Sequence, residues 1–400
     1  MPEEDTVRKI GANLDKEFFL NTLFHLIEVP TAVALGPDTL MQPDDPLLVQ
    51  YVQSVVRRIM MDSGIYDVIE MPKNQIVAKS GLDVSGERLL MQVYTPTQHN
   101  NLMEEPWTPR VRSVSECGIH EPCIFGQGVS QNKVHMAAAI TLLRAIVRSG
   151  VELRGLLYLG VNNEGRSSHA CSEALLSELS PRPRNALILI GTGLDISLGN
   201  RGRVDVYVHV RGRAGHSSAP EEALSAIDGA NEVINRLKEL KLNRKHPALG
   251  KQHALAYQVV YSPVAPHTLP GYARITVDRR LLPGDDVDEA VLEIAQAIGD
   301  LAPYEVSVEK GVYMLPALVS EDEAVVQHLK QAYRSVRGND PRTMYSKGTF
   351  DAGGLCALGI PTIMWGASGS SGLLDADFLR LSDAWDEVRI LCNVVSRWLG

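Results

Sequence analysis

Two segments of this 400-residue sequence carry side chains suited to chemistry. Glu164 follows the apolar run 153–161, and a carboxylate at the end of a buried strand can hold a metal ion or exchange a proton. The same carboxylate can instead cap a following helix, and both alternatives stay open. His216 precedes Ser217 and Ser218 in a glycine-flanked segment that has little reason to pack in a core. We therefore expect its imidazole to be functional.

The other histidines and the cysteines form no recognisable ligand set. His99, His120, His135 and His169 have spacings that match no metal-binding pattern, so we interpret them as ordinary loop and helix residues. The five cysteines include no Cys-x-x-Cys pair. This predicts reduced thiols, and neither disulfides nor a structural zinc site.

The composition limits the class of protein. The chain is 44% hydrophobic and 22% charged, which is typical of a globular protein, and its net charge is −9. Its length of 400 residues predicts two or three domains. It has no basic block, which argues against nucleic acid or an anionic membrane as partner. No run approaches the about 18 apolar residues that span a bilayer. Because the first residues are acidic and polar with no apolar signal region behind them, we expect a cytoplasmic protein.

The elements that must position these side chains alternate between helix and strand in the first half. Helical spacing predicts amphipathic helices at 15–30 and 45–64, and a helix rich in alanine at 134–148. Short apolar runs predict buried strands at 88–94, 153–161 and 186–190. This alternation predicts an α/β/α sandwich with a mixed, mostly parallel sheet, in which chemistry takes place beyond the strand ends.

The pattern changes after residue 201. Valines alternate with polar residues over 204–210, which predicts a strand with one buried face and leaves His209 exposed on the other. The order strand, helix, strand, strand, helix, strand then fills 202–312 and predicts a ferredoxin-like insertion. We expect one α/β domain made of 1–201 and 313–400, interrupted by a lid domain at 202–312.

Several motifs resemble a known family. The segment 212–230 reads GRAGHSSAPEEALSAIDGA, the segment 274–284 reads RITVDRRLLPG, and Asp351 lies in GTFDAGG. Together they resemble the dimerising zinc exopeptidases and deacylases, the family of acetylornithine deacetylase, succinyl-diaminopimelate desuccinylase, aminoacylase and glutamate carboxypeptidase. In that family two bridged zinc ions and a glutamate base hydrolyse amides, and a lid histidine from the partner subunit stabilises the oxyanion.

The resemblance assigns roles to four residues of this sequence. His216 matches the oxyanion histidine. Arg280 could clamp a substrate carboxylate, or it could form an ion pair with an aspartate such as Asp278. His267 stands where the family has an asparagine that meets substrate, whereas we expect Asp351 to be structural. The lid strand and the helix over 223–240 resemble the family's dimer surface, so we expect a homodimer joined lid to lid.

The positions that should hold the metals depart from the family. In family order, the replaced positions carry Tyr94 and Pro96, Gln131, Asn163 beside the retained Glu164, Thr192 between two glycines, and Leu373. Amides and leucine cannot supply the charge that holds Zn²⁺ or take a proton from water. The pattern therefore predicts no two-zinc site and at most one labile divalent ion, zinc or manganese, at Glu164. Tyr94, Gln131, Asn163 and Thr192 then become candidate substrate contacts.

Three hypotheses for the function follow. The first is a divergent hydrolase acting on an amide or amine C–N bond of a small carboxylate-bearing molecule, with Glu164 and His216 as catalytic residues. The second is a catalytically inactive relative that binds a small anionic ligand or a partner protein. The third is an aryl-amine hydrolase with one labile metal, because relatives in the family that resemble nitroanthranilate aminohydrolase suggest that the fold can remove an aryl amine.

Overall fold

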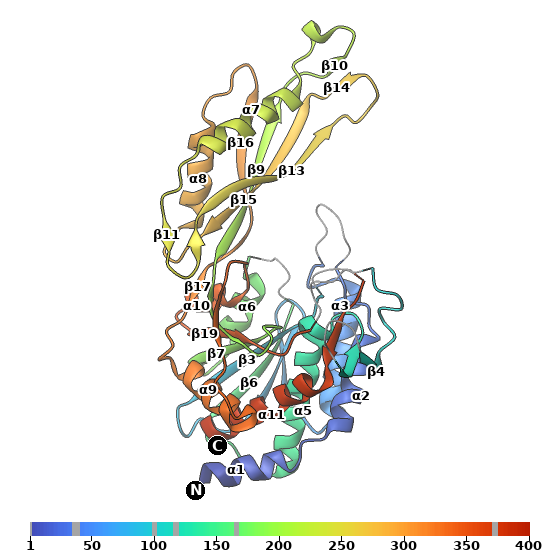
Figure 1. Cartoon of the computed structure of the whole chain (residues 1–400), viewed down its shortest axis with the longest axis vertical. Helices are drawn as coiled ribbons and strands as arrows, with labels where there is room; N and C mark the ends of the chain where they lie inside the picture. Colours follow the sequence, from blue (N-terminus) through green and yellow to red (C-terminus); the bar gives the residue numbers. More distant parts are fainter. Residues whose placement is uncertain (1, 34–40, 98–101, 115–119, 164–167, 370–374) are drawn as a thin grey trace. The chain divides into compact units, whose positions relative to one another are not determined.

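The chain divides into two compact units. The computed structural model describes residues 2–33, 41–97, 102–114, 120–163, 168–369 and 375–400. Unit 1 comprises Met1–Leu198, Val319–Met344 and Gly354–Gly400, and unit 2 comprises Gly199–Leu318 and Tyr345–Gly353 (Figure 1).

Unit 1 is built on a mixed sheet with a parallel centre. Its strands are β1 (Val68–Met71), β2 (Gln75–Ser80), β3 (Arg88–Tyr94), β6 (Leu156–Asn162), β7 (Asn185–Leu189), β8 (Ile196–Asn200) and β19 (Thr362–Trp365). Their order is β1-β2-β6-β3-β7-β19-β8, and β17 (Ala317–Leu318) and β18 (Thr343–Ser346) pair with β8. The contacts β6-β3, β3-β7 and β7-β19 are parallel. The carboxyl ends of the central strands therefore share one edge.

Helices cover both faces of this sheet. They are α1 (Pro2–Gly11), α2 (Lys16–Ile27), α3 (Pro46–Val49), η1 (Gln50–Val56), α4 (Arg57–Asp62), η2 (Val129–Lys133), α5 (Val134–Ser149), α6 (Ala170–Glu178), α9 (Ala324–Arg337), α10 (Ala352–Ala357) and α11 (Leu381–Trp398). One face of the sheet packs its apolar side chains against α2, α5, α9 and α11 in a single large core. Helix α6 lies on the opposite face, where Gly160 of β6 leaves room for Leu175.

A small sheet adjoins the beginning of η2. It consists of β4 (Arg110–Val114), β5 (Glu121–Phe125) and β20 (Phe378–Arg380), in the order β20-β5-β4. Phe125 and Phe378 stack with their ring centroids 5.1 Å apart. This packing brings the C-terminal segment beside the Gly126–Gly128 turn, where Gly126 N donates to Asp377 O at 3.2 Å.

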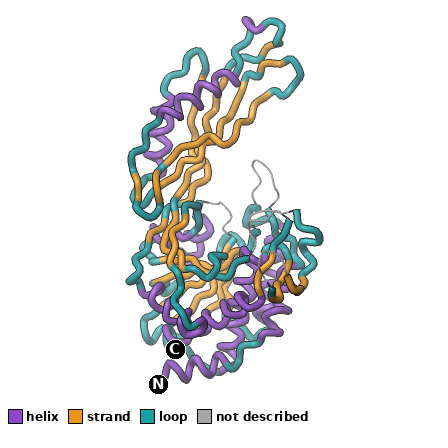
Figure 2. Tube along the Cα trace, in the orientation of Figure 1, coloured by secondary structure: helices purple, strands orange, loops and turns teal. Residues whose placement is uncertain are grey.

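Unit 2 contains a four-stranded antiparallel sheet with two helices on one face (Figure 2). Its main elements are β9 (Gly202–Arg211), α7 (Ala226–Glu239), β13 (His253–Ser262), β15 (Tyr272–Leu281), α8 (Val287–Ile298) and β16 (Glu305–Met314). Shorter elements are β10 (Gly215–His216), η3 (Pro220–Glu222), β11 (Lys245–His246), β12 (Gly250–Lys251) and β14 (Thr268–Leu269). The order β13-β15-β9-β16 is that of the predicted β-α-β-β-α-β unit, and the alternating valines of β9 pack under the helices.

Two local predictions need correction. The helix expected over 45–64 is divided into α3, the π-helical segment η1 and α4. His209 is not exposed on its strand face. Its side chain is 18% accessible, and its Nδ1 lies 2.8 Å from the hydroxyl of Tyr272 on the neighbouring strand β15. No helix in the described part of the chain is long and apolar enough to cross a bilayer.

Candidate functional site

The carboxyl ends of β3 and β6 are joined by a buried amide network. Asn163, which follows β6, is 1% accessible, and its Nδ2 donates to the carbonyl oxygens of Lys73 at 2.9 Å and Asn74 at 2.7 Å. The hydroxyl of Thr95, which follows β3, donates to Asn163 Oδ1. Asn132 Nδ2 donates to Thr95 O at 3.0 Å. These bonds orient the Asn163 amide toward backbone carbonyls.

Tyr94 belongs to a second buried polar group on the α6 side of the sheet. Its side chain is 6% accessible, and its hydroxyl accepts a hydrogen bond from Gln92 Nε2 at 3.2 Å. Gln92 and Asn162 both reach the hydroxyl of Ser172 on α6, at 3.4 and 3.1 Å. The substrate role predicted for Tyr94 stays a prediction, and the observed environment is a packed polar layer.

The loop that should carry the bridging carboxylate is held by Asp377. Its two carboxylate oxygens accept from Gly128 N at 2.7 Å, Ser130 N at 3.1 Å and Ser130 Oγ at 2.6 Å. Asp377 thus acts as a cap for η2, which continues into α5. Burial raises the pKa of Asp377, although these hydrogen bonds oppose that shift. Gln131 lies in η2 and is partly buried.

The side chain of Lys133, at the end of η2, is fully buried. Its Nζ donates to Val29 O at 2.6 Å and Ile27 O at 3.3 Å, and it lies 4.8 Å from the ring centroid of Trp107. Burial lowers the pKa of Lys133 to about 7, because the charged ammonium loses its hydration. This lysine anchors the loop to the end of α2.

A buried histidine–carboxylate pair lies behind the ends of β7 and β19. His135 on α5 and Glu387 on α11 are both fully buried, with Nδ1 2.7 Å from Oε1. The other oxygen of Glu387 accepts from Ala367 N at 2.8 Å. Thr192, after β7, donates to Asp195 O at 2.6 Å and accepts from Gly366 N at 3.2 Å. Thr192 is therefore committed to the turn that follows its strand.

Unit 2 brings two predicted residues together at one end. His216 on β10 and His267, one residue before β14, have ring centroids 6.2 Å apart, and both are exposed. Ser217 N donates to His267 O at 2.8 Å. Ser218 N donates to His216 Nδ1 at 3.2 Å, and the Ser218 hydroxyl lies 2.7 Å from the same nitrogen. When Nδ1 accepts both of these hydrogen bonds, the proton of the neutral ring is on Nε2. His216 therefore presents an N–H donor to solvent.

Arg280 is already engaged. Its Nε and Nη2 donate to one carboxylate oxygen of Asp278, at 3.0 and 2.8 Å, and both side chains are 17% accessible. Of the two roles predicted for Arg280, the ion pair with Asp278 is therefore the one observed. The clamp remains compatible with it only if a substrate displaces Asp278 or uses the remaining Nη1, which is buried without a hydrogen-bond partner among the described residues.

Some predicted positions lie outside the described residues. Glu164, the candidate acid, base and metal ligand, is one of them, as are Leu373 and His99. Among the residues that are described, no three histidine, cysteine, aspartate or glutamate side chains are grouped so that they could hold a metal ion.

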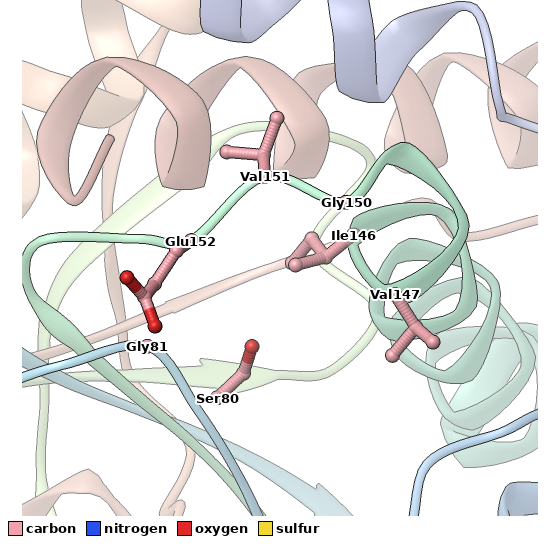
Figure 3. Close-up of a pocket in the computed structure, with 7 residues that line it drawn as sticks. All are labelled: Ser80, Gly81, Ile146, Val147, Gly150, Val151 and Glu152. Carbon is pink, nitrogen blue, oxygen red and sulfur yellow. The ribbon is translucent and has the colours of Figure 1, made fainter.

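A cavity of about 290 Å³ in unit 1 is not at the predicted site. Figure 3 shows the Ser80 hydroxyl and the Glu152 carboxylate on one side and Ile146 and Val147 of α5 on the other. Ser80 pairs with Leu157 at the beginning of β6, so this cavity lies at the sheet edge opposite to Asn163.

Known proteins resemble this chain both within unit 2 and over most of its length. Residues 198–305 match the model of the M20 peptidase dimerisation domain. The uncharacterised protein YgeY of Escherichia coli K12 is 26% identical over 262 residues, which are 61% of this chain and 64% of YgeY, less than two thirds of its length. A succinyl-diaminopimelate desuccinylase of Helicobacter hepaticus is 21% identical over 338 residues, covering 76% of this chain and 84% of that protein.

A solved structure with the same fold is that of an M20 family metallo-carboxypeptidase of Sulfolobus solfataricus. It superimposes with a TM-score of 0.74 and 15% identity over 95% of this chain and 99% of that one. In sequence the chain is similar to M20 peptidase-type deacylases, and in fold it is similar to M20 peptidases. The resemblance drawn from the lid motifs and the predicted fold class are both confirmed.

The described strand-end residues do not fit the pair of zinc ions that the M20 resemblance implies. Asn163 directs its amide nitrogen to carbonyl groups and its oxygen to Thr95, and Thr192 is bonded within its own turn. Neither offers a charged, unengaged oxygen of the kind that coordinates zinc.

Sequence reasoning missed three residues that organise the M20-like strand ends. They are Asp377, Lys133 and Glu387, to which the sequence analysis assigns no role. The available signal for Lys133 was a charged residue within the apolar stretch that begins α5. The pairing of His135 with Glu387 had no local signal, because 252 residues separate them.

Proposed function

We propose that this chain is a divergent hydrolase that cleaves an amide or amine C–N bond in a small molecule bearing a carboxylate. The observation that carries this proposal is the hydrogen bond from Ser218 N to His216 Nδ1. It holds the imidazole so that Nε2–H is a donor facing solvent, which is the arrangement needed to stabilise an oxyanion. His267 lies beside it and supplies a second ring that a substrate can contact.

Within this proposal Glu164 acts as the acid or base that activates water. Of the neighbouring residues Asn163 and Glu164, only the carboxylate of Glu164 can accept a proton at neutral pH. Gln131, Tyr94, Asn163 and Thr192 belong to the proposal as polar residues near the substrate, and Asn163 and Thr192 keep the hydrogen bonds described above. One divalent ion, zinc or manganese, bound through Glu164 belongs to the proposal as an alternative, with an aryl amine as the leaving group.

A second candidate is a relative without turnover that binds a small anion or a protein partner. The ion pair between Arg280 and Asp278 favours it, because an arginine that already has a carboxylate partner clamps a substrate less strongly. The neutral character of Asn163 supports the same candidate. The two candidates differ in one measurable respect, which is catalytic turnover that depends on Glu164 and His216.

We also propose a homodimer formed by unit 2, with 202–312 as a lid and dimerisation domain. Strand β13 is at the edge of its sheet and exposes apolar side chains along its length. Leu255 is 58% and Val259 43% accessible, and Ile227 of α7 is 44% accessible. An apolar strand edge favours pairing with a second copy. Light scattering at micromolar concentration tests this, and a monomer would contradict it.

The decisive experiment combines turnover with metal analysis. Purified protein is assayed against N-acyl amino acids, dipeptides and an aryl amine, with bound metal measured by elemental mass spectrometry before and after addition of Zn²⁺ or Mn²⁺. We expect turnover that falls about 100- to 1,000-fold in His216→Ala, mostly in kcat, because an oxyanion donor is lost. Ser217→Ala is the matched control and should retain activity.

The outcomes separate the candidates. Loss of turnover in both Glu164→Ala and His216→Ala supports the hydrolase. Absence of turnover over the whole panel supports the binding protein. About one metal per chain that can be removed together with activity supports the aryl-amine alternative, whereas two tightly held metals would contradict our interpretation of the strand ends.

A further inference from the structure

A second cavity lies within unit 2, between α8 and the segment that follows α7. It has a volume of about 310 Å³, and Arg279 of β15 forms part of its wall. Volumes of this size are at the lower end of those that hold small ligands. Neither His216, His267 nor Arg280 lines it. It is therefore separate from the residues discussed above.

Arg279 is the unusual member of this cavity. It lies on the helix-facing side of β15 between Val277 and Leu281, and it is 1% accessible. Its Nη2 donates to Glu293 Oε2 at 2.7 Å, and its Nη1 donates to the carbonyl oxygen of Arg280. Its Nε is buried and has no hydrogen-bond partner among the described residues. A buried guanidinium with an unused N–H is stabilised by an additional acceptor, and a carboxylate is the best match.

Much of the remaining charge in the wall is already compensated. Asp285 accepts from Gln252 Nε2 at 2.5 Å and Leu282 N at 2.8 Å, and it forms an ion pair with Arg244. Asp286 caps α8 by accepting from Asp288 N and Glu289 N at 2.8 and 2.9 Å. These two aspartates hold the wall in place and are not available to a ligand.

Two charges of opposite sign remain at the cavity. The ammonium of Lys241 and the carboxylate of Glu289 are exposed, and neither forms an ion pair or side-chain hydrogen bond with the described part of the chain. Glu293, one turn after Glu289 on α8, uses only Oε2 toward Arg279. The cavity thus offers unused donors for an anion and unused acceptors for a cation. Leu242 and Ala290 add apolar wall between them.

We propose that this cavity binds a small free amino acid. Its carboxylate meets Lys241 beside the part of Arg279 that lines the wall, and its ammonium meets Glu289 and the unused oxygen of Glu293. Leu242 and Ala290 leave space for a short aliphatic side chain. A zwitterion pairs with both charges, whereas a ligand carrying one charge pairs with only one of them, so the zwitterion is preferred. The inference rests on unit 2 alone and does not depend on the proposed hydrolase activity.

Isothermal titration of the full chain with L-alanine tests this inference. Acetate and methylammonium serve as probes that carry one charge each. We expect alanine to bind at least about tenfold more tightly than either probe. Glu289→Gln and Lys241→Ala should each weaken alanine binding about tenfold or more, and because both residues are exposed the variants should fold normally.

Matched controls lie on neighbouring surfaces. Glu239→Gln at the end of α7 and Lys245→Ala on β11 change the same charges outside the cavity and should leave binding unchanged. Absence of alanine binding at millimolar concentration would overturn the inference. So would binding that persists in both Glu289→Gln and Lys241→Ala but disappears in His216→Ala, because the ligand would then occupy the proposed hydrolase site.

Discussion

The strand ends of unit 1 and the histidine pair of unit 2 contain residues of similar chemical type in opposite environments. Asn163 is 1% accessible, and each of its amide atoms has a partner. His216 and His267 are exposed, and Ser218 contacts His216 through Nδ1. Polar residues in the first region stabilise the fold by bonding to one another. Polar residues in the second region are available to a ligand.

This difference shows that residue type alone does not identify a functional side chain. A buried amide whose donors and acceptors are all used costs free energy to disturb, whereas an exposed imidazole costs little. The two regions should therefore respond differently to comparable substitutions. Four measurements sharpen or break this comparison.

The largest expected effect is at Asp377. Asp377→Ala removes the acceptor of three hydrogen bonds and leaves the Gly128 and Ser130 donors buried. We expect the free energy of unfolding to fall by about 3–5 kcal/mol, as measured by urea denaturation. Asp375→Ala in the same segment is the control. A loss below about 1 kcal/mol would mean that the loop is held by other contacts.

Asn163→Asp is expected to destabilise by about 1–3 kcal/mol at neutral pH. The new carboxylate would face the carbonyl oxygens of Lys73 and Asn74, which now accept from the amide nitrogen. Urea denaturation at pH 7 measures the effect. Protonation at low pH should reduce it, because a neutral carboxyl group can donate one hydrogen bond. A stabilising effect would show that this position tolerates charge, as a metal site would require.

Lys133 gives a pH-dependent prediction. Its folded pKa of about 7 lies below its unfolded value, so between these values the unfolded chain binds more protons at this site. The contribution of Lys133 to the free energy of unfolding therefore increases as the pH rises above 7, and it is lowest below pH 7. Relative to Lys133→Met, the free energy of unfolding of the natural protein should increase by about 2 kcal/mol from pH 7 to pH 9. A constant difference would show that Lys133 remains charged.

The smallest effect is expected at His267. Its φ of 54° is one that asparagine adopts readily, and the side chain is exposed. His267→Asn should therefore change the free energy of unfolding by less than about 0.5 kcal/mol. Thermal unfolding of the two proteins in parallel measures this. A large destabilisation would place His267 with the structural residues of unit 1 and remove the contrast.

Much of the fold was predictable because its determinants are local. The apolar run over 88–94 coincides with β3, and the valine alternation predicts β9. The strand-end environment was less predictable, since burial of Asn163 depends on Lys73 and Asn74, about 90 residues earlier. His216 and His267 were each predicted separately. Their proximity depends on the pairing of β10 with β14, which neither segment reveals alone.

The place of β19 in the sheet has a consequence for folding during synthesis. This strand comes from residues 362–365 but lies between β7 and β8, which are made much earlier. The nascent chain can complete the contiguous strands β9 to β16 of unit 2 while β7, already next to β3, still lacks β19 on its other side. Contacts between such distant segments slow folding. The last tenth of the chain therefore determines when the first half becomes stable. A chain that ends before β19 leaves the parallel edge of β7 unpaired.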